Sequence, residues 1–197
     1  MVSKTRDKLI EVARQLFVHK GLDNTTMNDI ANASDKGRRT IYTYFKSKRE
    51  IYNAVIERES DLRVSRLRGI AEDDSLQPVE KLKKFLTDRY QLSSISPSRT
   101  SSDSIRSMFS LDFKRVDRIR QLSYEKESAL FKSILDEGVA SGAFNQEQSS
   151  RLNHFMHRWL LLADWSSSAQ FVQPEEAMAY WTDLIDFIVY GIQPHNQ

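Results

Sequence analysis

The chain contains no cysteine, few glycines and prolines, and no long uninterrupted apolar run. Without cysteine there is no disulfide framework, no thiolate metal site and no cysteine nucleophile, which is compatible with a reducing compartment. No apolar run reaches the roughly 18 residues that a membrane span needs, and the N-terminus lacks the basic-then-apolar pattern of a signal peptide. We therefore expect a cytoplasmic protein without a membrane segment.

Six glycines and four prolines in 197 residues leave little to interrupt helices, and apolar residues recur with helical rather than alternating spacing. We expect an all-α protein of about nine helices, with no strand. The longer helices are expected to end near glycines, at Gly21 and Gly138, or to begin at a proline, at Pro78. The helices we expect cover residues 4–19, 25–33, 38–45, 48–68, 78–92, a short segment near 105–109, 111–137, 152–165 and 174–190.

The net charge of the chain is only +2, but the charge is unevenly distributed. Residues 1–50 hold eleven Lys and Arg against six Asp and Glu, whereas the remainder has an excess of acids. A basic N-terminal part on a mildly acidic body is typical of a DNA-binding domain joined to a separate assembly domain. We place the division between residues 47 and 48.

The segment 25–48 has the pattern of two short helices around a tight turn. Thr25 and Thr26 can cap the start of the first helix, and Asp29, three residues after Thr26, completes a capping-box-like pattern. Ile30 and Ala31 fall on the buried face of that helix. The turn follows at residues 34–37, where we expect Gly37 to adopt the positive φ of a sharp corner.

The second helix of this pair buries Ile41 and Phe45, four residues apart, and presents polar groups elsewhere. Arginine can form a bidentate pair with guanine, threonine offers a methyl and a hydroxyl, and tyrosine can reach phosphates. Lys48 adds a charge at the start of the next helix, where phosphate is favoured. The alternative is a solvated Arg38-Arg39 pair beside core tyrosines. We expect a helix-turn-helix whose candidate DNA contacts are Thr25, Thr26, Arg38, Arg39, Thr40, Tyr42, Thr43, Tyr44 and Lys48.

Residues 7–52 resemble the N-terminal domain of the TetR family of transcriptional regulators. The resemblance rests on Lys20-Gly21, Thr25-Thr26 and the run Thr40-Ile41-Tyr42-Thr43-Tyr44-Phe45 followed by Ser47-Lys48, among other positions. In the family the turn usually reads Ala-Gly-Val, whereas this chain has Ser34-Asp35-Lys36. The resemblance implies a three-helix DNA-binding domain at 1–47 and a helical effector-binding and dimerisation domain at 48–197.

The last two expected helices are apolar over more than one face. In residues 152–165 and 174–190, apolar side chains extend beyond the single stripe that a protein core would cover. A second subunit is the natural cover for the other side, so we expect a homodimer through these two helices. The alternative is that both helices are buried within one monomer.

The resemblance further implies a small-molecule effector that binds among the middle helices. The candidate effector-binding residues are Tyr90, Met108, Phe109, Phe113 and Trp159. We predict a homodimeric DNA-binding regulator, a repressor released from a near-palindromic double-stranded operator by that effector. The alternative is a DNA-dependent protein-interaction factor without an effector.

Evidence for an enzyme is thin. The chain has no glycine-rich phosphate loop and no nucleophile elbow. His154 and His157 are three residues apart on an expected helix, but neither has a glutamate three positions before it, so the di-iron bundle pattern fails. We expect no enzyme activity, no metal and no cofactor.

Overall fold

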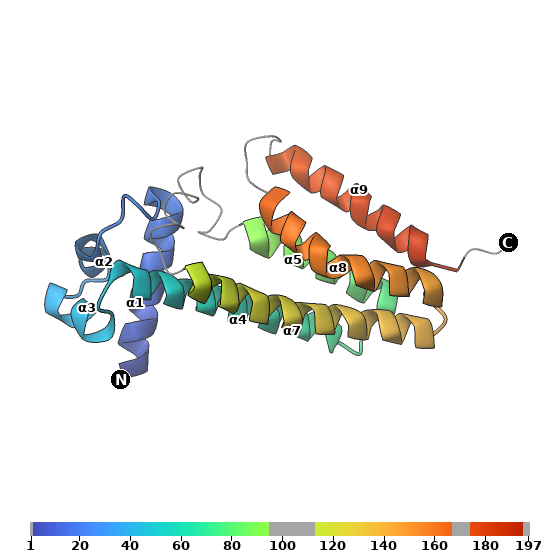
Figure 1. Cartoon of the computed structure of the whole chain (residues 1–197), viewed down its shortest axis with the longest axis horizontal. Coiled ribbons are helices and arrows are strands. Elements are labelled where there is room, and N and C mark those ends of the chain that lie inside the picture. The colour runs from blue at the N-terminus through green and yellow to red at the C-terminus, as the bar shows by residue number, and fades with distance from the viewer. Residues whose placement is uncertain (1, 95–112, 167–173, 195–197) are drawn as a thin grey trace. The chain divides into compact units, whose positions relative to one another are not determined.

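The computed structural model describes residues 2–94, 113–166 and 174–194, and in this part of the chain α-helices joined by short turns are the only regular secondary structure. The prediction of an all-α protein is therefore confirmed. The expected short helix near residues 105–109 lies outside the described residues. No helix among those described is long and apolar enough to cross a membrane. The helices in Figure 1 are α1 Val2–Lys20, α2 Met27–Ala33, α3 Arg38–Tyr44, α4 Lys48–Ala71, α5 Pro78–Ser94, α7 Phe113–Ala140, α8 Gln146–Ser166 and α9 Pro174–Ile192.

The first of two compact units contains the described residues up to Asp61 and the start of α7, to Gln121. Its core joins one face of each of α1 to α4. The ring of Phe17 on α1 meets Tyr52 on α4 edge-on, with ring centroids 5.8 Å apart. The first turns of α4 complete this core, so this compact unit includes residues on both sides of residue 47. The fully or nearly buried members on α1 to α3 are Leu9, Ile10, Ala13, Phe17, Ile30, Ala31 and Ile41.

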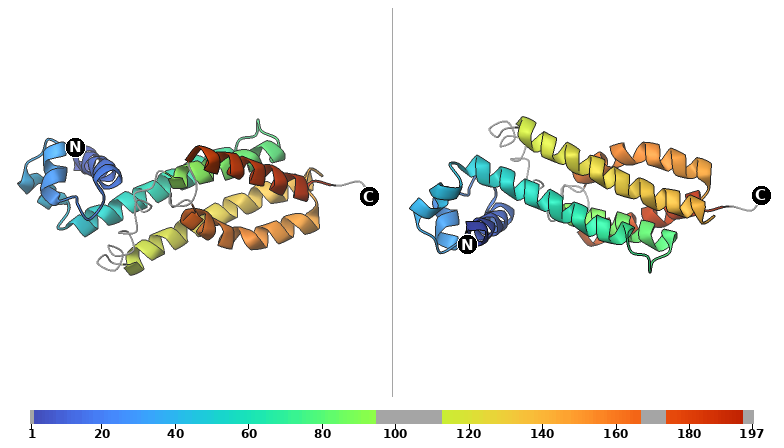
Figure 2. Two further views of the ribbon diagram at one scale, coloured as in Figure 1. Left: turned by 90° about the horizontal axis from the view of Figure 1, so that it is seen from above. Right: turned by 90° about the horizontal axis from the view of Figure 1, so that it is seen from below.

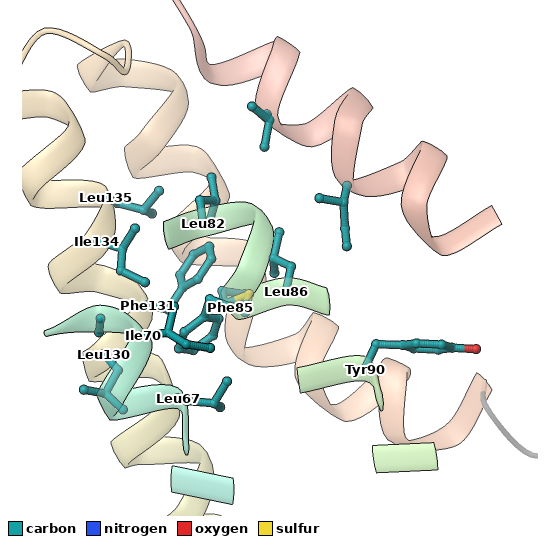
Figure 3. Close-up of a cluster of buried hydrophobic side chains, with 14 of the residues drawn as sticks. Leu67, Ile70, Leu82, Phe85, Leu86, Tyr90, Leu130, Phe131, Ile134 and Leu135 are labelled. Carbon is teal, nitrogen blue, oxygen red and sulfur yellow. The ribbon is translucent and has the colours of Figure 1, made fainter. Parts of the chain in front are cut away.

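The second unit contains the rest of α4 and α7 together with α5, α8 and α9. Within this unit α5 packs against both α8 and α9, and the helices run roughly alongside one another in both views of Figure 2. Figure 3 shows the centre of its core, where Phe85 of α5 lies against Phe131 of α7 with ring centroids 5.8 Å apart. Leucine and isoleucine side chains from α4, α5 and α7 surround these rings.

The C-terminal end of α7 differs from the sequence prediction. We expected the helix to stop at Gly138, but it continues to Ala140, and Gly142, with φ +76°, takes the left-handed conformation beyond its end. Gly138 is required for a different reason. A Cβ there would lie 1.9 Å from the Phe144 ring, so the glycine makes room for an aromatic side chain that packs on the helix. The role of Gly138 is therefore packing and not helix termination.

Candidate nucleic-acid interface

The start of α2 is held by the capping box that the sequence predicts. The Thr26 hydroxyl accepts a hydrogen bond from the Asp29 N–H at 3.1 Å, and the Asp29 carboxylate accepts one from the Thr26 N–H at 2.8 Å. Lys20, at the end of α1, also donates to this carboxylate at 2.8 Å. Lys20 and then Thr26 hydrogen-bond the ionised form of Asp29, which lowers its pKa from 3.8 to about 2.

The turn between α2 and α3 corrects one prediction. Gly37 has φ −66° and is the N-cap of α3, whereas the positive φ, 55°, is found at Asp35. The Lys36 N–H donates to the Ala31 carbonyl at 2.9 Å and the Asp35 N–H to the Asn32 carbonyl at 3.1 Å. This pair of bonds is the Schellman motif, in which the residue after the C-cap is left-handed. Aspartate tolerates that conformation better than most residues, so the turn closes without glycine.

The second helix of the pair, α3, separates its buried and exposed faces clearly. Ile41 is buried in the core, and Phe45, the C-cap residue, donates its N–H to the Ile41 carbonyl at 2.9 Å. Arg38 and Arg39 are exposed. Tyr42 is also exposed, and the Arg38 guanidinium carbon lies 5.6 Å from the centroid of its ring. The face opposite the core therefore carries cationic and hydroxyl groups in reach of solvent.

The remaining predicted residues of α3 lie partly on that face. Thr43 is exposed, and its hydroxyl donates to the Arg39 carbonyl at 3.0 Å. Thr40 is half-buried. Tyr44 is also half-buried and packs on the core. For this tyrosine the structure agrees in part with the alternative interpretation, in which the tyrosines of this helix are core residues. The structure thus brings five of these predicted contacts, Arg38, Arg39, Thr40, Tyr42 and Thr43, to the accessible part of one short helix.

Two other predicted DNA contacts are engaged within the protein. Thr25 is 0% exposed, and its hydroxyl donates to the Gly21 carbonyl at 2.7 Å. Its side chain therefore joins the end of α1 to the start of α2 and is turned away from solvent. The Lys48 ammonium donates to the carbonyls of Leu22 at 2.8 Å and Asp23 at 3.3 Å. Two of its three N–H donors thus hold the loop between α1 and α2.

Ion pairing separates the cations of residues 1–50 into two groups. Arg14 pairs with Glu11, Lys20 pairs with Asp29, and Lys48 binds carbonyls. In the part of the chain that the structure describes, no salt bridge is formed by the other eight, which are Lys4, Arg6, Lys8, Lys36, Arg38, Arg39, Lys46 and Arg49. The positive charge available to an external anion is therefore concentrated at α3, the residues that follow it, and the start of α1.

The predicted effector-binding residues are mostly outside the described part. Met108 and Phe109 lie outside the described residues, and the side chains of Phe113 and Trp159 lie outside them too. Tyr90 is buried in the core of the second unit, where its ring stacks on Trp181 of α9 with centroids 4.5 Å apart. Its place at the edge of the aliphatic cluster is visible in Figure 3. The His154 ring lies edge-on to Phe155, and no metal-binding cluster occurs among the described residues.

A buried charged cluster in the second unit was not predicted from the sequence. The Glu127 carboxylate is fully buried and accepts hydrogen bonds from Arg63 Nε at 2.8 Å, Arg89 Nε at 2.5 Å and the Ser123 hydroxyl at 2.8 Å. The Arg89 guanidinium also lies 5.9 Å from the Tyr124 ring centroid. Each charged residue occupies a core-facing position of its helix. A charged residue on an otherwise apolar stripe was the signal that could have revealed the cluster.

The chain is similar to known transcription regulators in sequence and in fold. Residues 9–55 match the family model of bacterial regulatory proteins of the tetR family. Over 147 residues the chain is 26% identical to the HTH-type transcriptional repressor KstR2 of Mycolicibacterium smegmatis, which covers 72% of this chain and 68% of that protein. Over 60 residues it is 40% identical to the probable acrEF/envCD operon repressor of Escherichia coli, covering 30% of this chain and 27% of that protein.

A solved structure extends the similarity beyond the helix-turn-helix. A transcriptional regulator of the TetR/AcrR family from Thermobifida fusca superposes with a TM-score of 0.66 at 23% identity, covering 91% of this chain and 95% of that chain. The matched family segment contains α2, the turn and α3, where the exposed cations are found. These relatives are regulators and not enzymes. Residues 9–55 carry the N-terminal domain of the tetR family of bacterial regulatory proteins, and the similarity to curated repressors supports a DNA-binding transcription regulator.

Proposed function

We propose that the protein is a homodimeric repressor that binds a near-palindromic operator through α3 and is released by a small-molecule effector. Residues 1–47 bind DNA in this proposal, and residues 48–197 bind the effector and form the dimer. The observation that carries the proposal is the exposed polar face of α3, set in place by the capping box of α2 and the Schellman turn. The names of two curated relatives, both repressors, support the direction of regulation.

Within this proposal α3 lies in the major groove. Arg38 and Arg39 have no acidic partner among the described residues, so their guanidiniums are available to pair with guanine O6 and N7. The cation–π contact with Tyr42 restrains Arg38 and reduces the entropy lost when it binds. Thr40 and Thr43 contribute methyl and hydroxyl groups for base edges and phosphates.

Residues that we propose to contact the DNA backbone lie around this base-reading helix. Thr26 lies at the start of α2, where free N–H groups favour a phosphate. Lys48 retains one N–H donor beyond the two that bind carbonyls, and Tyr44 is half-buried, so part of its side chain is accessible. Thr25 has a structural role in this proposal because its hydroxyl is buried.

The dimer proposal is supported by the outer face of α9. Trp181, Ile185 and Val189 of this helix face the core, while another set of large apolar side chains on the same helix is exposed. Phe187 is 73% exposed and Tyr190 is 65% exposed. An apolar face of this kind is typical of a subunit interface, and an isologous contact would place two copies of it together. The exposed set on α8 and α9 is Phe155, Tyr180, Leu184, Phe187 and Tyr190.

Two-fold symmetry links the dimer to the operator. Two recognition helices that enter successive major grooves must be about 34–36 Å apart, so the half-sites should be centred about one helical turn apart. An effector that binds more tightly to a dimer with a different spacing of these helices lowers the affinity for DNA. By linkage, bound DNA lowers the affinity for the effector by the same factor. The candidate effector contacts are Tyr90, Met108, Phe109, Phe113 and Trp159.

Selection of bound duplexes from a random DNA pool tests the proposal. At about physiological salt, the purified protein should enrich a near-palindrome with half-sites about one turn apart. Arg39→Ala should then lose about 1–3 kcal/mol of discrimination at one position of each half-site. Arg151→Ala removes another exposed arginine, on α8, and should leave the selected sequence unchanged. Binding without any sequence preference by the wild-type protein would refute the operator proposal.

The molar mass in solution tests the dimer. The wild-type chain should have twice the mass of one chain at micromolar concentration, and Phe187→Glu should shift it toward the monomer by placing a charge on the apolar face. Leu122→Glu makes the same change at an exposed leucine of α7 and should not alter the mass. A stable wild-type monomer at this concentration would exclude the α9 interface.

A further inference from the structure

Arg6 occupies an unusual position on α1. The buried stripe of this helix contains Leu9, Ile10, Ala13 and Phe17. One turn before it, three residues from Leu9 and four from Ile10, the same stripe reaches Arg6. A cation therefore occupies the end of an apolar face, where a further core residue would be expected. Its own side chain is exposed.

The side chain of Arg6 lies at the end of α3. Its guanidinium carbon is 5.3 Å from the centroid of the Phe45 ring, and Phe45 is the buried C-cap residue of α3. The start of α1 is itself held in place, because Arg58 of α4 donates to the Asp7 carbonyl at 3.0 Å. The guanidinium is thus positioned by two other helices of the same unit.

The charge of Arg6 is available for an external anion. In the described part of the chain it forms no salt bridge, in contrast to Arg14 and Lys20, whose charges are engaged by Glu11 and Asp29. The guanidinium carbon lies over the Phe45 ring, and a cation–π contact of this kind leaves the N–H donors at the edge of the guanidinium able to bind an anion. Such a pre-oriented fork matches the geometry of a phosphate group.

We propose that Arg6 binds a phosphate of the DNA backbone beside the end of the recognition helix. This inference rests on the proposed binding of α3 in the major groove. That groove is only about 12 Å wide, so a helix within it is flanked by the phosphates of both strands. A guanidinium held against the C-cap of α3 is therefore near one of these phosphate rows. Arg6 anchors the reading helix from outside the helix-turn-helix and contributes no base preference.

The test compares Arg6→Met with Lys8→Met, using a fluorescent duplex of arbitrary sequence over a series of salt concentrations. Methionine keeps apolar contact with Phe45 but removes the charge, and Lys8 provides a matched exposed cation on the opposite side of α1. Arg6→Met should reduce the slope of log affinity against log salt by about 0.9 for each Arg6 that contacts a phosphate. Lys8→Met should change the slope much less, and Arg6→Lys should preserve most of it.

Three outcomes would overturn the inference. Equal effects of Arg6→Met and Lys8→Met on the salt slope would show that both charges act through the overall electrostatic field, and that Arg6 makes no specific phosphate contact. An unchanged slope for Arg6→Met, with DNA selection still altered by Arg39→Ala, would refute the Arg6 contact while leaving the proposed function intact. The third outcome combines lower thermal stability of Arg6→Met with a slope of log affinity against log salt that is unchanged in Arg6→Ala. This result would show that the Arg6 side chain stabilises Phe45 and does not bind DNA. If Arg39→Ala also has no effect, the proposed function itself fails.

Discussion

Removal of the Glu127 side chain should strongly destabilise the second unit. This carboxylate is 0% exposed and accepts three hydrogen bonds, from Arg63, Arg89 and Ser123. The two arginine side chains are only 9% and 2% exposed, so without the carboxylate both charges would remain buried and lose their shared counterion. Removing one partner of a buried ion pair costs about 3–5 kcal/mol. We expect Glu127→Ala to lower the free energy of unfolding by about this amount.

The assay is urea-induced unfolding followed by far-ultraviolet circular dichroism. Glu147→Ala is the control, because it breaks an exposed ion pair with Arg151 and should cost at most about 0.5 kcal/mol. Replacing the whole cluster, with Leu at Glu127 and Met at Arg63 and Arg89, should recover most of the loss because no unpaired charge remains. If Glu127→Ala cost no more than Glu147→Ala, the cluster would not be the buried charge network that its geometry indicates.

Two further predictions concern the DNA-binding unit. Lys48→Met should lower the free energy of unfolding by about 1 kcal/mol, because it removes the bonds to the Leu22 and Asp23 carbonyls, and should weaken binding to all duplexes alike. Thermal unfolding and a salt titration check this, and a fully stable variant would argue against the loop contact. The Asp29 carboxyl has a lowered pKa, so its contribution to stability is present above pH 3.8 and is lost as the pH falls through about 2. Lys20→Met should raise that pKa toward 3.8 in a titration followed by nuclear magnetic resonance, and an unchanged value would exclude Lys20 as the main cause.

The helix-turn-helix was predictable because its signals are local. A capping box requires two residues three apart, and a buried helix face requires apolar residues three and four apart, so both can be recognised in a single sequence. Thr26 with Asp29 and Ile41 with Phe45 satisfied these rules, and the structure shows the expected bonds and burial. The overall helical class followed in the same way from the scarcity of glycine and proline.

The turn shows where local reasoning failed. Glycine is the usual residue for a positive φ, so Gly37 was the natural choice, but the C-terminal hydrogen bonds of α2 require that conformation two residues earlier. The position was determined by where α2 ends, which depends on the burial of Ile30 and Ala31 against neighbouring helices. A residue preference alone could not place it.

The sequence by itself determined the helical class, the helix-turn-helix and the exposed basic residues of α3, because each depends on spacing within one helix or on composition. Only the tertiary structure decided which cations remain available. Lys48 and Arg6 are both basic residues near the same helices, yet one binds carbonyls of a loop 25 and 26 residues away and the other lies over Phe45. Likewise, Glu127 joins residues 64 and 38 positions away in the chain. Contacts between residues so distant in sequence form only when helices pack, so no local pattern contains them.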